Sequence, residues 1–592
     1  MCGIFGFWLN RPLNDDDIEQ GKAALQMLAH RGPDGESSFA DRENGLFLGH
    51  RRLAILDLDD RSSQPMHRFG ATMVYNGEIY NFVELREELE KRGIKFRTTG
   101  DSEVLIAAWQ EYGQEMFEKL DGMYAVCIRD QDGIILATDP FGEKPLYIYE
   151  TYEGFYFASE PKPLIQIGRL DFVPSQREEN LFLALGFLPP PMTGYKNLSV
   201  APPGFFRRYV TPDNCSTKSH SYSPYSQGGG ARRPDDAFLD EVSEVLSTSI
   251  ARRLRSDVPI GLFLSAGVDS ALLAAMISTE LKKDITSYTV TFPDGRDEAD
   301  GASDIANYLR IQHRVIDSRE TVSPDLLPKV LTDIYAVPND NLTAISVEQM
   351  SRAARSEVTV ALSGLGGDEL AYGYNKYDFM VQNAVFYKAP PVLYDLLALL
   401  TPKSNLFRKV STLIRFMRCS PSWRTIAIKN GIAVDALEDM QNLLDLSEWL
   451  DDTAETAAAG MRSFDIQQTM PANYIPSVDR GSMRASLEVR CPFLSVDLFR
   501  KMDELNVHAF EAVGRKHVLK RLLNRYLPDE LVEKPKQGFV FPVQRWSNTL
   551  GRVMPQRFDK FPRLKSMWQQ REQSEVSMLF WRAELLGQLK RT

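Results

Sequence analysis

The chain has 592 residues and a formal net charge of −11 at pH 7. A chain of this length is too long for one hydrophobic core, so we expect two or three domains. Its acidic character argues against a nucleic-acid partner that needs an overall basic surface, and small polar substrates fit it better. No stretch is apolar for long enough to cross a bilayer, and the N-terminus lacks the pattern of a signal peptide. We therefore expect a cytoplasmic protein without a membrane partner.

The cysteines lie far apart in the sequence, at Cys2, Cys127, Cys215, Cys419 and Cys491. They form no CxxC pair and have no histidine-rich neighbour, so the spacing predicts neither a zinc site nor a disulfide framework. We expect reduced thiols.

The N-terminus carries a candidate nucleophile. Removal of Met1 would leave Cys2 with a thiol and a free α-amine on one residue. A thiol near its reference pKa of about 8.5 is only a few per cent thiolate at neutral pH, whereas an α-amine near about 7.8 is partly unprotonated and can accept its proton. Taken alone, a cysteine at this position would more often be a small buried residue than a nucleophile. The motifs in the rest of the chain distinguish the two alternatives.

The first two hundred residues alternate short strands with turns. Helical patterns occur at about 16–29, 81–92 and 102–112, so this half is predicted to be α/β with much antiparallel sheet. A break follows at about 211–236, where a polar stretch leads into a run of glycines. Such a composition buries too little apolar surface to order itself, and we interpret it as an interdomain loop.

Residue 237 begins a second pattern, in which long helices alternate with apolar strands at 259–264, 287–292 and 358–362. Each strand is followed by Gly-rich sequence and then a helix, which is typical of a parallel, doubly wound sheet. The stretch 374–470 is predicted to be mostly helical.

The run from Ser265 to Ser270 reads SAGVDS and joins an apolar strand to a helix. A turn of small residues lets backbone N–H groups converge on an anion, and the helix N-terminus adds positive potential. The site suits pyrophosphate, and Asp269 could hold the Mg²⁺ that accompanies it. The run lacks the ending of a Walker loop, and an ordinary tight turn is the alternative.

A second strand ends in another glycine-rich loop, SGLGGDE, at residues 363–369. Two such loops at neighbouring strand ends would frame one nucleotide crevice, with Asp269 and Asp368 as partners for one metal ion. The alternative interpretation of these two aspartates is a pair of helix caps.

Taken together, these runs resemble the glutamine-hydrolysing asparagine synthetase family of class II glutamine amidotransferases, over almost the whole chain. In the first half the matching runs are MCGIFG (1–6), HRGPD (30–34), GHRRL (49–53), YNGEIYN (75–81), GDSE (100–103) and DPFGEKPLY (139–147). In the second half they are the SAGVDS and SGLGGDE loops, DRGSM (479–483), LEVR (487–490) and KPKQGF (534–539).

The resemblance implies the fold. We expect an α/β protein of two domains. The first is an N-terminal nucleophile hydrolase αββα sandwich over residues 2–210, followed by the linker at 211–236. The second is a pyrophosphatase-type doubly wound parallel sheet over residues 237–592, with a helical C-terminal part. Homodimers are usual in the family, so the resemblance makes a homodimer possible, although no run of residues indicates a dimer interface.

The resemblance also implies roles for residues of the first domain. Cys2 would attack the glutamine side-chain amide, with Asn76 and Gly77 forming the oxyanion hole. Glutamine would be bound by Arg52, Asn76, Glu78 and Asp101, with Arg52 on its α-carboxylate and Asp101 on its α-ammonium. From the residues alone, Arg52 and Asp101 could be a surface ion pair, and Asn76-Gly77 favours a type I′ hairpin turn that could coexist with the oxyanion role.

In the second domain, the resemblance implies that ATP adenylates a carboxylate and that ammonia, channelled from the first domain, attacks the acyl-adenylate. The cofactors would be ATP and Mg²⁺, with the metal on Asp269 and Asp368. The residues that would bind ATP and pyrophosphate are Leu264, Ser265, Gly267, Asp269, Ser270, Val290, Ser363, Gly364 and Lys536. Lys536 could neutralise charge on the adenylate or equally be a solvated surface lysine.

The chain departs from the usual family pattern around the acceptor. Ala266 and Ala271 stand where a glycine and a serine are common, and Leu365 stands where many asparagine synthetases have a glutamate. Leucine can neither position an amine nor take a proton from attacking ammonia. The run AVPNDNLT at 336–343 also lacks the acidic pair of DEPFADPS.

Three hypotheses therefore remain open. The simplest is glutamine-dependent amidation of L-aspartate to L-asparagine, with AMP and pyrophosphate released. The second is amidation of another carboxylate, such as a uronic acid of a sugar nucleotide or a modified amino acid, which Leu365 and Ala336-Val337 favour slightly. The third is a catalytically silent scaffold, and intact Cys2 and Asp269 count against it.

Overall fold

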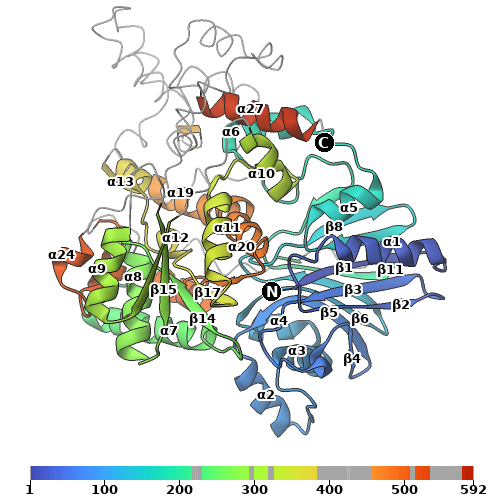
Figure 1. The fold of residues 1–592 in the computed structure, drawn as a ribbon, viewed down its shortest axis with the longest axis horizontal. Helices are drawn as coiled ribbons and strands as arrows, with labels where there is room; N and C mark the ends of the chain where they lie inside the picture. The colour runs from blue at the N-terminus through green and yellow to red at the C-terminus, as the bar shows by residue number, and fades with distance from the viewer. Residues whose placement is uncertain are drawn as a thin grey trace, which may run out of the picture.

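The computed structural model describes residues 2–215, 220–221, 230–291, 299–317, 326–382, 423–424, 426, 456–506, 508, 514–533 and 577–590. Within these residues the chain forms two antiparallel sheets in its first part and one parallel sheet in its second part (Figure 1). The N-terminus lies between the two parts (Figure 1).

The first antiparallel sheet has the strand order β10-β8-β9-β1-β3-β2. Its strands are β1 (Gly3–Leu9), β2 (Gly35–Asp41), β3 (Leu46–Arg52), β8 (Tyr147–Thr151), β9 (Gly154–Ala158) and β10 (Leu198–Val200). Strand β1 is central and pairs with β3 and β9, so the residue that precedes it is held at the end of a buried strand.

The second antiparallel sheet has the order β12-β11-β7-β6-β5-β4, with β13 also paired to β11. Its strands are β4 (Met66–Arg68), β5 (Ala71–Ile79), β6 (Gly122–Asp130), β7 (Gly133–Thr138), β11 (Phe205–Thr211), β12 (Asn214–Cys215) and β13 (His220–Ser221).

The two antiparallel sheets pack face to face. One apolar cluster between them joins Ile4 and Phe157 of the first sheet to Val74 and Leu136 of the second. Helices α1 (Asp15–Gln26) and α5 (Pro161–Gly168) cover the outer face of the first sheet. Helices α2 (Phe82–Lys91) and α3 (Asp101–Tyr112) cover the outer face of the second. The first domain is therefore the expected four-layer αββα sandwich.

Four short elements complete the described part of the first domain. They are η1 (Asp60–Ser62), η2 (Gly113–Glu115), α4 (Met116–Lys119) and α6 (Gln176–Leu185). Strands β12 and β13 lie inside the segment that we expected to be a loop at 211–236. That expectation was wrong for these residues, because pairing along the edge of β11 requires backbone hydrogen bonds and not apolar side chains.

The parallel sheet has the order β16-β15-β14-β17-β18. Its strands are β14 (Ile260–Phe263), β15 (Thr286–Thr291), β16 (Gln312–Asp317), β17 (Val360–Leu362) and β18 (Glu488–Arg490). The order reverses between β14 and β17, as in a doubly wound sheet. The strands predicted at 259–264, 287–292 and 358–362 are confirmed, as are the helices predicted near α1, α2 and α3.

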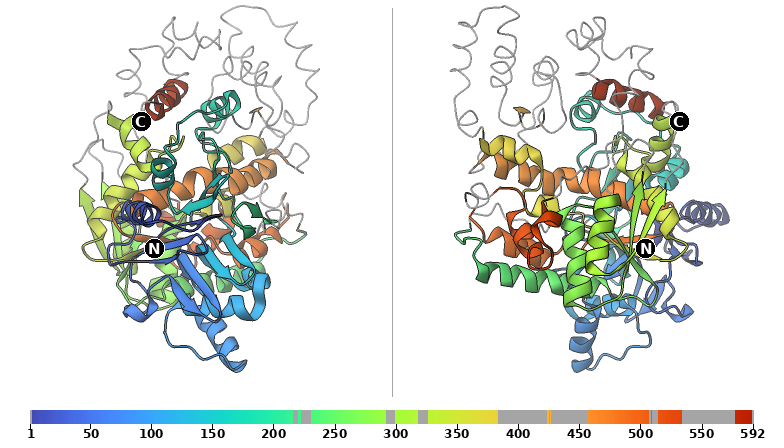
Figure 2. Two further views of the ribbon diagram at one scale, coloured as in Figure 1. Left: turned by 90° about the vertical axis from the view of Figure 1, so that its right-hand side faces the viewer. Right: turned by 60° about the vertical axis from the view of Figure 1, so that its left-hand side comes forward.

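Helices pack around the parallel sheet, and the last described helix lies away from the sheet, against α6 (Figure 2). The helices are α7 (Asp236–Arg253), α8 (Val268–Ala275), η3 (Met276–Glu280), α9 (Ala299–Leu309), α10 (Leu327–Tyr335), α11 (Thr343–Ala354), α12 (Gly367–Leu370), α13 (Asn375–Gln382), α19 (Ala457–Phe464), η6 (Asp465–Tyr474), α20 (Ile475–Met483), α21 (Val496–Asp503), α23 (His517–Leu523), α24 (Asp529–Val532) and α27 (Ser577–Leu589). Of the stretch 374–470, predicted to be mostly helical, the described part is largely helical and the rest lies outside the described residues. None of the helices in the described residues is both long and apolar enough to span a bilayer.

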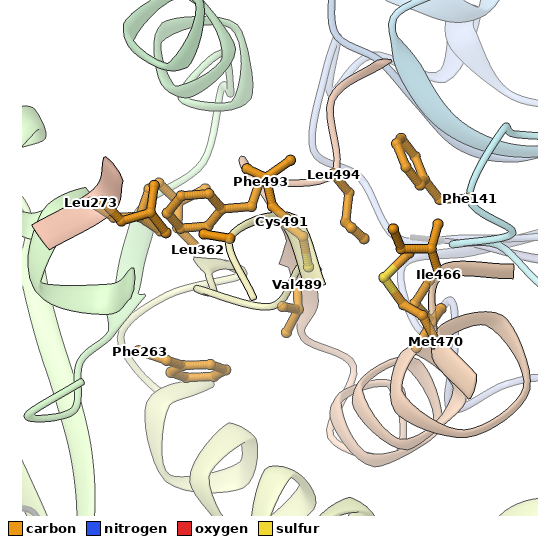
Figure 3. Close-up of a cluster of buried hydrophobic side chains, with 14 of the residues drawn as sticks. Phe141, Phe263, Leu273, Leu362, Ile466, Met470, Val489, Cys491, Phe493 and Leu494 are labelled. Carbon is orange, nitrogen blue, oxygen red and sulfur yellow. The ribbon is translucent and has the colours of Figure 1, made fainter. Parts of the chain in front are cut away.

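The apolar core of the second domain extends into the first. Phe141 of the first domain belongs to the same buried cluster as Leu494, Ile466 and Met470 and lies beside them (Figure 3). Its ring centroid lies 5.0 Å from that of Phe499. Because the two domains share one core, their relative position is held by apolar burial.

Buried charges also cross the domain boundary. The Arg31 guanidinium, which is 0% exposed, donates to both carboxylate oxygens of Asp479 on α20 at 2.9 and 3.1 Å, and to Glu160 at 2.9 Å. Lys144 lies 3.6 Å from Asp479, and Arg480 lies 2.8 Å from Glu160. Burial alone would raise the pKa of Asp479, but Arg31 and Lys144 hold the pKa below its ordinary value.

We expect Asp479→Asn to lower the free energy of unfolding by about 3–5 kcal/mol, because it leaves buried cations without their partner. Since the folded-state pKa of Asp479 is lowered, its stabilising effect is present above the ordinary carboxyl pKa of about 3.9 and is lost as the pH falls below it. Urea unfolding at pH 7 measures the loss. The matched control is Asp333→Asn, whose half-exposed carboxylate also bridges the domains through Lys162 at 3.0 Å and Arg484 at 3.2 Å. The control should cost no more than about 1 kcal/mol, and equal losses would contradict the prediction.

Candidate functional site

Cys2 lies where the two antiparallel sheets meet, at the start of β1. Its backbone N–H donates to Asn76 Oδ1 on β5 at 2.9 Å, and its Sγ lies 4.0 Å from the Leu53 carbonyl oxygen. Arg31 Nε donates to the Cys2 carbonyl at 3.1 Å, which fixes the residue from a third side. Burial raises the pKa of the Cys2 thiol above its ordinary value, so a thiolate forms here only with a base close by.

Asn76 and Gly77 lie within β5, paired with Ala125 and Tyr124 of β6. The hairpin turn suggested by the dipeptide is therefore absent, because the sheet extends through it. A Cβ atom on Gly77 would lie 2.1 Å from the Met123 carbonyl oxygen, so only glycine allows the strands this approach. Asn76 is fully buried with its side chain turned to Cys2.

A pocket beside Cys2 is lined by Arg52, Gly77, Glu78 and Asp101. The structure thus brings together the residues that the first domain was expected to contribute. Arg52 and Asp101 are 9% and 5% exposed, which contradicts the alternative of a surface ion pair.

Each of these side chains is held by its surroundings. Arg52 Nη1 donates to the Asp59 carbonyl at 2.9 Å, and Nη2 donates to the Asp57 carbonyl. Asp101 begins α3 and accepts the Ile79 N–H at 2.9 Å and the Tyr75 hydroxyl. Burial raises the pKa of Asp101, and burial together with the charge of Asp101 raises the pKa of Glu78. Two buried carboxylates in one pocket favour a cationic ligand.

Sequence reasoning missed several residues that line this pocket, among them Gln64, His50 and Tyr75. Gln64 Oε1 accepts the Tyr75 N–H at 2.6 Å, next to the Asn76 that holds Cys2. His50 also lines the pocket, and burial and the charge of Arg52 lower its pKa to about 3, so it is neutral. The GHRRL and YNGEIYN runs already contained His50 and Tyr75, whereas nothing in the sequence marked Gln64.

The second site lies at the carboxyl ends of β14 and β17, which are adjacent and parallel. The loop after β14 leads into α8, whose first turn carries Asp269, and the loop after β17 leads into α12, whose first turn carries Asp368. A Cβ on Gly364 would lie 2.9 Å from Asp269 Cβ, and one on Gly367 would lie 2.6 Å from Asp269 Cγ. These glycines therefore let the two loops touch.

Asp269 and Asp368 converge on one cation. Lys516 Nζ lies 2.5 Å from Asp269 Oδ2 and 2.7 Å from Asp368 Oδ1, and the lysine is 6% exposed. The helix N-caps are Gly267 and Gly366, so the alternative of two helix caps was wrong. Sequence reasoning missed Lys516, because no motif or spacing linked it to either loop.

The remaining predicted residues of the second domain lie around this point. Ser265 N–H donates to Ser270 Oγ at 3.0 Å, and Gly267 N–H donates to Ser265 Oγ at 3.1 Å. Leu264 N–H donates to the Tyr288 carbonyl of β15, the strand that also carries the buried Val290. Ser363 N–H donates to the Arg490 carbonyl at 2.9 Å. Lys536 lies outside the described residues.

The donor set suits a magnesium ion that shares its coordination with phosphates. Mg²⁺ is usually bound by one or two carboxylates together with substrate phosphates and water. Two carboxylates already surround one positive charge here, and no group of three or more potential ligands occurs in the part of the chain that the structure describes. The residues therefore fit Mg²⁺ only in company with a nucleotide.

The positions where the chain departs from the family pattern have apolar or structural surroundings. Leu365 packs against the core of the second domain, and Ala271 is buried within it. Asp340 pairs with Arg582 of α27 at 2.6 Å, and Asn341 Nδ2 donates to Asn473 Oδ1 at 2.6 Å. The polar side chains of 339–341 are thus engaged in holding α27 and η6 against the domain.

Comparison with known proteins agrees with this geometry. Residues 1–223 match the family model described as a glutamine amidotransferase domain, and residues 241–577 match the one described as asparagine synthase. The glutamine-hydrolyzing asparagine synthetase 1 of Bacillus subtilis is 31% identical over 570 residues, covering 92% of this chain and 88% of the relative.

Two further matches are more distant. Amidase chry2 of Gibberella zeae is 24% identical over 92% of this chain and 90% of its own length. A solved glutamine phosphoribosylpyrophosphate amidotransferase of B. subtilis, complexed with ADP and GMP, matches with a TM-score of 0.30 and 16% identity, over 61% of this chain and 81% of that one.

Each matched region contains one of the two sites. The first site is built around Cys2, and the second around the SAGVDS and SGLGGDE loops. The chain belongs to the asparagine synthase family and is a glutamine-dependent carbon–nitrogen ligase that uses ATP.

Proposed function

We propose that Cys2, freed by removal of Met1, attacks the side-chain amide of glutamine while its own α-amine takes the thiol proton. The observation that supports this role is the contact between the Cys2 nitrogen and Asn76 Oδ1. With Oδ1 so engaged, the buried Asn76 Nδ2 has no hydrogen-bond partner among the described residues. It is the donor that an oxyanion beside Cys2 would need, together with the Gly77 N–H.

Glutamine would lie with its α-carboxylate on Arg52 and its α-ammonium between Glu78 and Asp101. The guanidinium and the two carboxylates line the same pocket as the nucleophile. Opposite charges in the one pocket would select the zwitterionic end of an amino acid and orient the amide toward Cys2.

In the second domain, ATP would bind across the two loops, with pyrophosphate on Ser265, Gly267, Ser270, Ser363 and Gly364 and with Leu264 and Val290 beside the nucleotide. Asp269 and Asp368 would hold Mg²⁺, which supplies positive charge to the leaving pyrophosphate. Lys516 would then direct its ammonium to the phosphates, and Lys536 would neutralise charge on the adenylate.

The acceptor is most simply L-aspartate, giving L-asparagine, AMP and pyrophosphate. Ammonia released at Cys2 would travel between the domains to the acyl-adenylate. The domain limits that we propose are 2–210 for the glutaminase and 237–592 for the synthetase, joined by 211–236. One observation favours a second candidate: Leu365 and Ala336-Val337 stand where relatives carry carboxylates, and the Asp340 carboxylate nearby is paired with Arg582, which suits a different carboxylate acceptor.

The acceptor is tested by measuring pyrophosphate release with ATP, Mg²⁺ and glutamine across a panel of carboxylates, with mass spectrometry of the products. The panel includes aspartate, modified amino acids and uronic-acid sugar nucleotides. Release with aspartate and formation of asparagine would support the first candidate. Pyrophosphate release with another acid and none with aspartate would support the second candidate. No release with any acid would contradict both.

A further inference from the structure

Arg490 belongs to the parallel sheet of the second domain, but its side chain reaches the glutamine pocket of the first. It lies in β18, and its carbonyl oxygen accepts the N–H of Ser363 in the nucleotide loop. The guanidinium is 0% exposed, and its Nη2 lies 3.5 Å from Glu78 Oε1. The LEVR run that contains Arg490 has no part in the proposed glutamine hydrolysis or in the proposed adenylation.

The rest of the guanidinium is fixed within the second domain. Nε donates to Glu488 Oε1 at 2.7 Å, and Nη1 donates to the carbonyls of Arg253 and Arg255 at 2.9 and 2.7 Å. These three bonds leave Nη2 as the end that faces Glu78. Neither Nη2 nor Glu78 Oε1 has a hydrogen-bond partner among the described residues, although both atoms are buried. The Glu78 carboxylate therefore faces the free end of a guanidinium whose Nε is already paired with Glu488.

Glu78 needs that compensation because of its other neighbours. The charged and titratable groups that act on it come from every side: Asp101 of α3, Glu488 and Arg490 of β18, Cys2 and the amino terminus beside β1, and Tyr75 of β5. Two of these are carboxylates in the same buried region. Burial and Asp101 raise the pKa of Glu78, and Arg490 opposes them. Without the guanidinium the pKa of Glu78 would be higher still, and less of the side chain would carry the negative charge that attracts a cationic ligand.

We propose that Arg490 is a positioning residue of the glutamine site, contributed by the second domain, which favours the ionised form of Glu78 and directs its carboxylate at the α-ammonium of glutamine. The inference rests on the glutamine-binding role proposed for Glu78. It implies that the affinity for glutamine depends on β18 of the synthetase sheet. The backbone carbonyl of the same Arg490 accepts the Ser363 N–H and so also holds the nucleotide loop.

The test uses the full chain and compares Arg490→Met with Arg490→Lys, measuring kcat and KM for glutamine hydrolysis from pH 6.5 to 8.5 and ammonia-dependent pyrophosphate release. Arg490→Met should raise the KM for glutamine at neutral pH by about tenfold or more, since each unit added to the Glu78 pKa removes about nine tenths of its ionised form. The KM of this variant should fall as the pH rises, because Glu78 then ionises. Arg490→Lys should restore most of the affinity, and ammonia-dependent release should stay close to that of the unaltered chain.

The matched control is Arg253→Met, which removes an equally buried guanidinium that donates to Ser249 Oγ and the Leu494 carbonyl and lies 3.5 Å from Asp121. Among the described residues it has no hydrogen bond or ion pair with Glu78. It should leave the KM for glutamine unchanged. If Arg490→Met does not fold, Arg490→Gln removes the charge while keeping a donor for the carbonyls of Arg253 and Arg255, with the same expectations.

A double-mutant cycle separates this inference from the function on which it rests. If Glu78→Gln raises the KM for glutamine, then adding Arg490→Met should raise it no further, and an additive increase would overturn the inference. An unchanged KM in Arg490→Met, or an equal loss with glutamine and with ammonia, would overturn it as well. An unchanged KM in Glu78→Gln would refute the binding role of Glu78 itself, and this inference with it.

Discussion

Replacing Cys2 with alanine is expected to abolish product formation from glutamine while product formation from ammonia survives. The thiol is the only group of the proposed glutaminase that forms a bond to the substrate, so its loss removes the ammonia source. The second site lies at the carboxyl ends of β14 and β17, and its loops make no use of Cys2. Pyrophosphate release and product yield, measured with glutamine and then with ammonium salt, give the two rates.

Cys127→Ala is the matched control for the Cys2 variant. Cys127 is a free thiol buried between the sheets on β6, and burial raises its pKa well above the ordinary value. The Cys127→Ala variant should still form product from glutamine and from ammonia, since a thiol buried between the sheets has no access to glutamine. Loss of both activities in Cys2→Ala would show that Cys2 is needed for the fold and would contradict its role as nucleophile.

Asp269→Asn is expected to reduce acceptor-dependent pyrophosphate release on the order of 100-fold or more, while basal glutamine hydrolysis remains measurable. Loss of a partner that only supports a metal ligand typically costs about 10–100-fold, so loss of a direct ligand should cost at least as much. The substitution also leaves Lys516 beside one carboxylate instead of two. The larger loss should appear in kcat, because the charge on the leaving pyrophosphate develops in the transition state.

Two measurements decide the Asp269 prediction. Titration with Mg²⁺ should show a higher requirement in the variant, and glutamine hydrolysis without acceptor should continue. Asp333→Asn serves as a control. Its half-exposed carboxylate bridges the domains by pairing with Lys162 and Arg484, and it belongs to neither nucleotide loop. A fall in glutamine hydrolysis equal to the fall in pyrophosphate release would mean that Asp269 supports the fold and not the phosphate chemistry.

The sequence by itself determined the identity of the chemistry-bearing groups and the two kinds of domain. Cys2 was visible because its function depends on its covalent position next to Met1, and the SAGVDS and SGLGGDE loops because a strand, a glycine-rich turn and a helix are local features. Strand and helix periodicity likewise predicted an antiparallel half followed by a parallel sheet, which β14, β15 and β17 confirm.

Only the tertiary structure decided which of these groups meet. Asn76-Gly77 is a turn by its local preference and a mid-strand pair in the protein, because pairing with β6 over the length of β5 outweighs the preference of two residues. Lys516 reaches Asp269 across 247 positions, and Arg490 reaches Glu78 from the other domain. No local pattern encodes such contacts, because they depend on the strand order of the sheets and on the packing of one domain against the other.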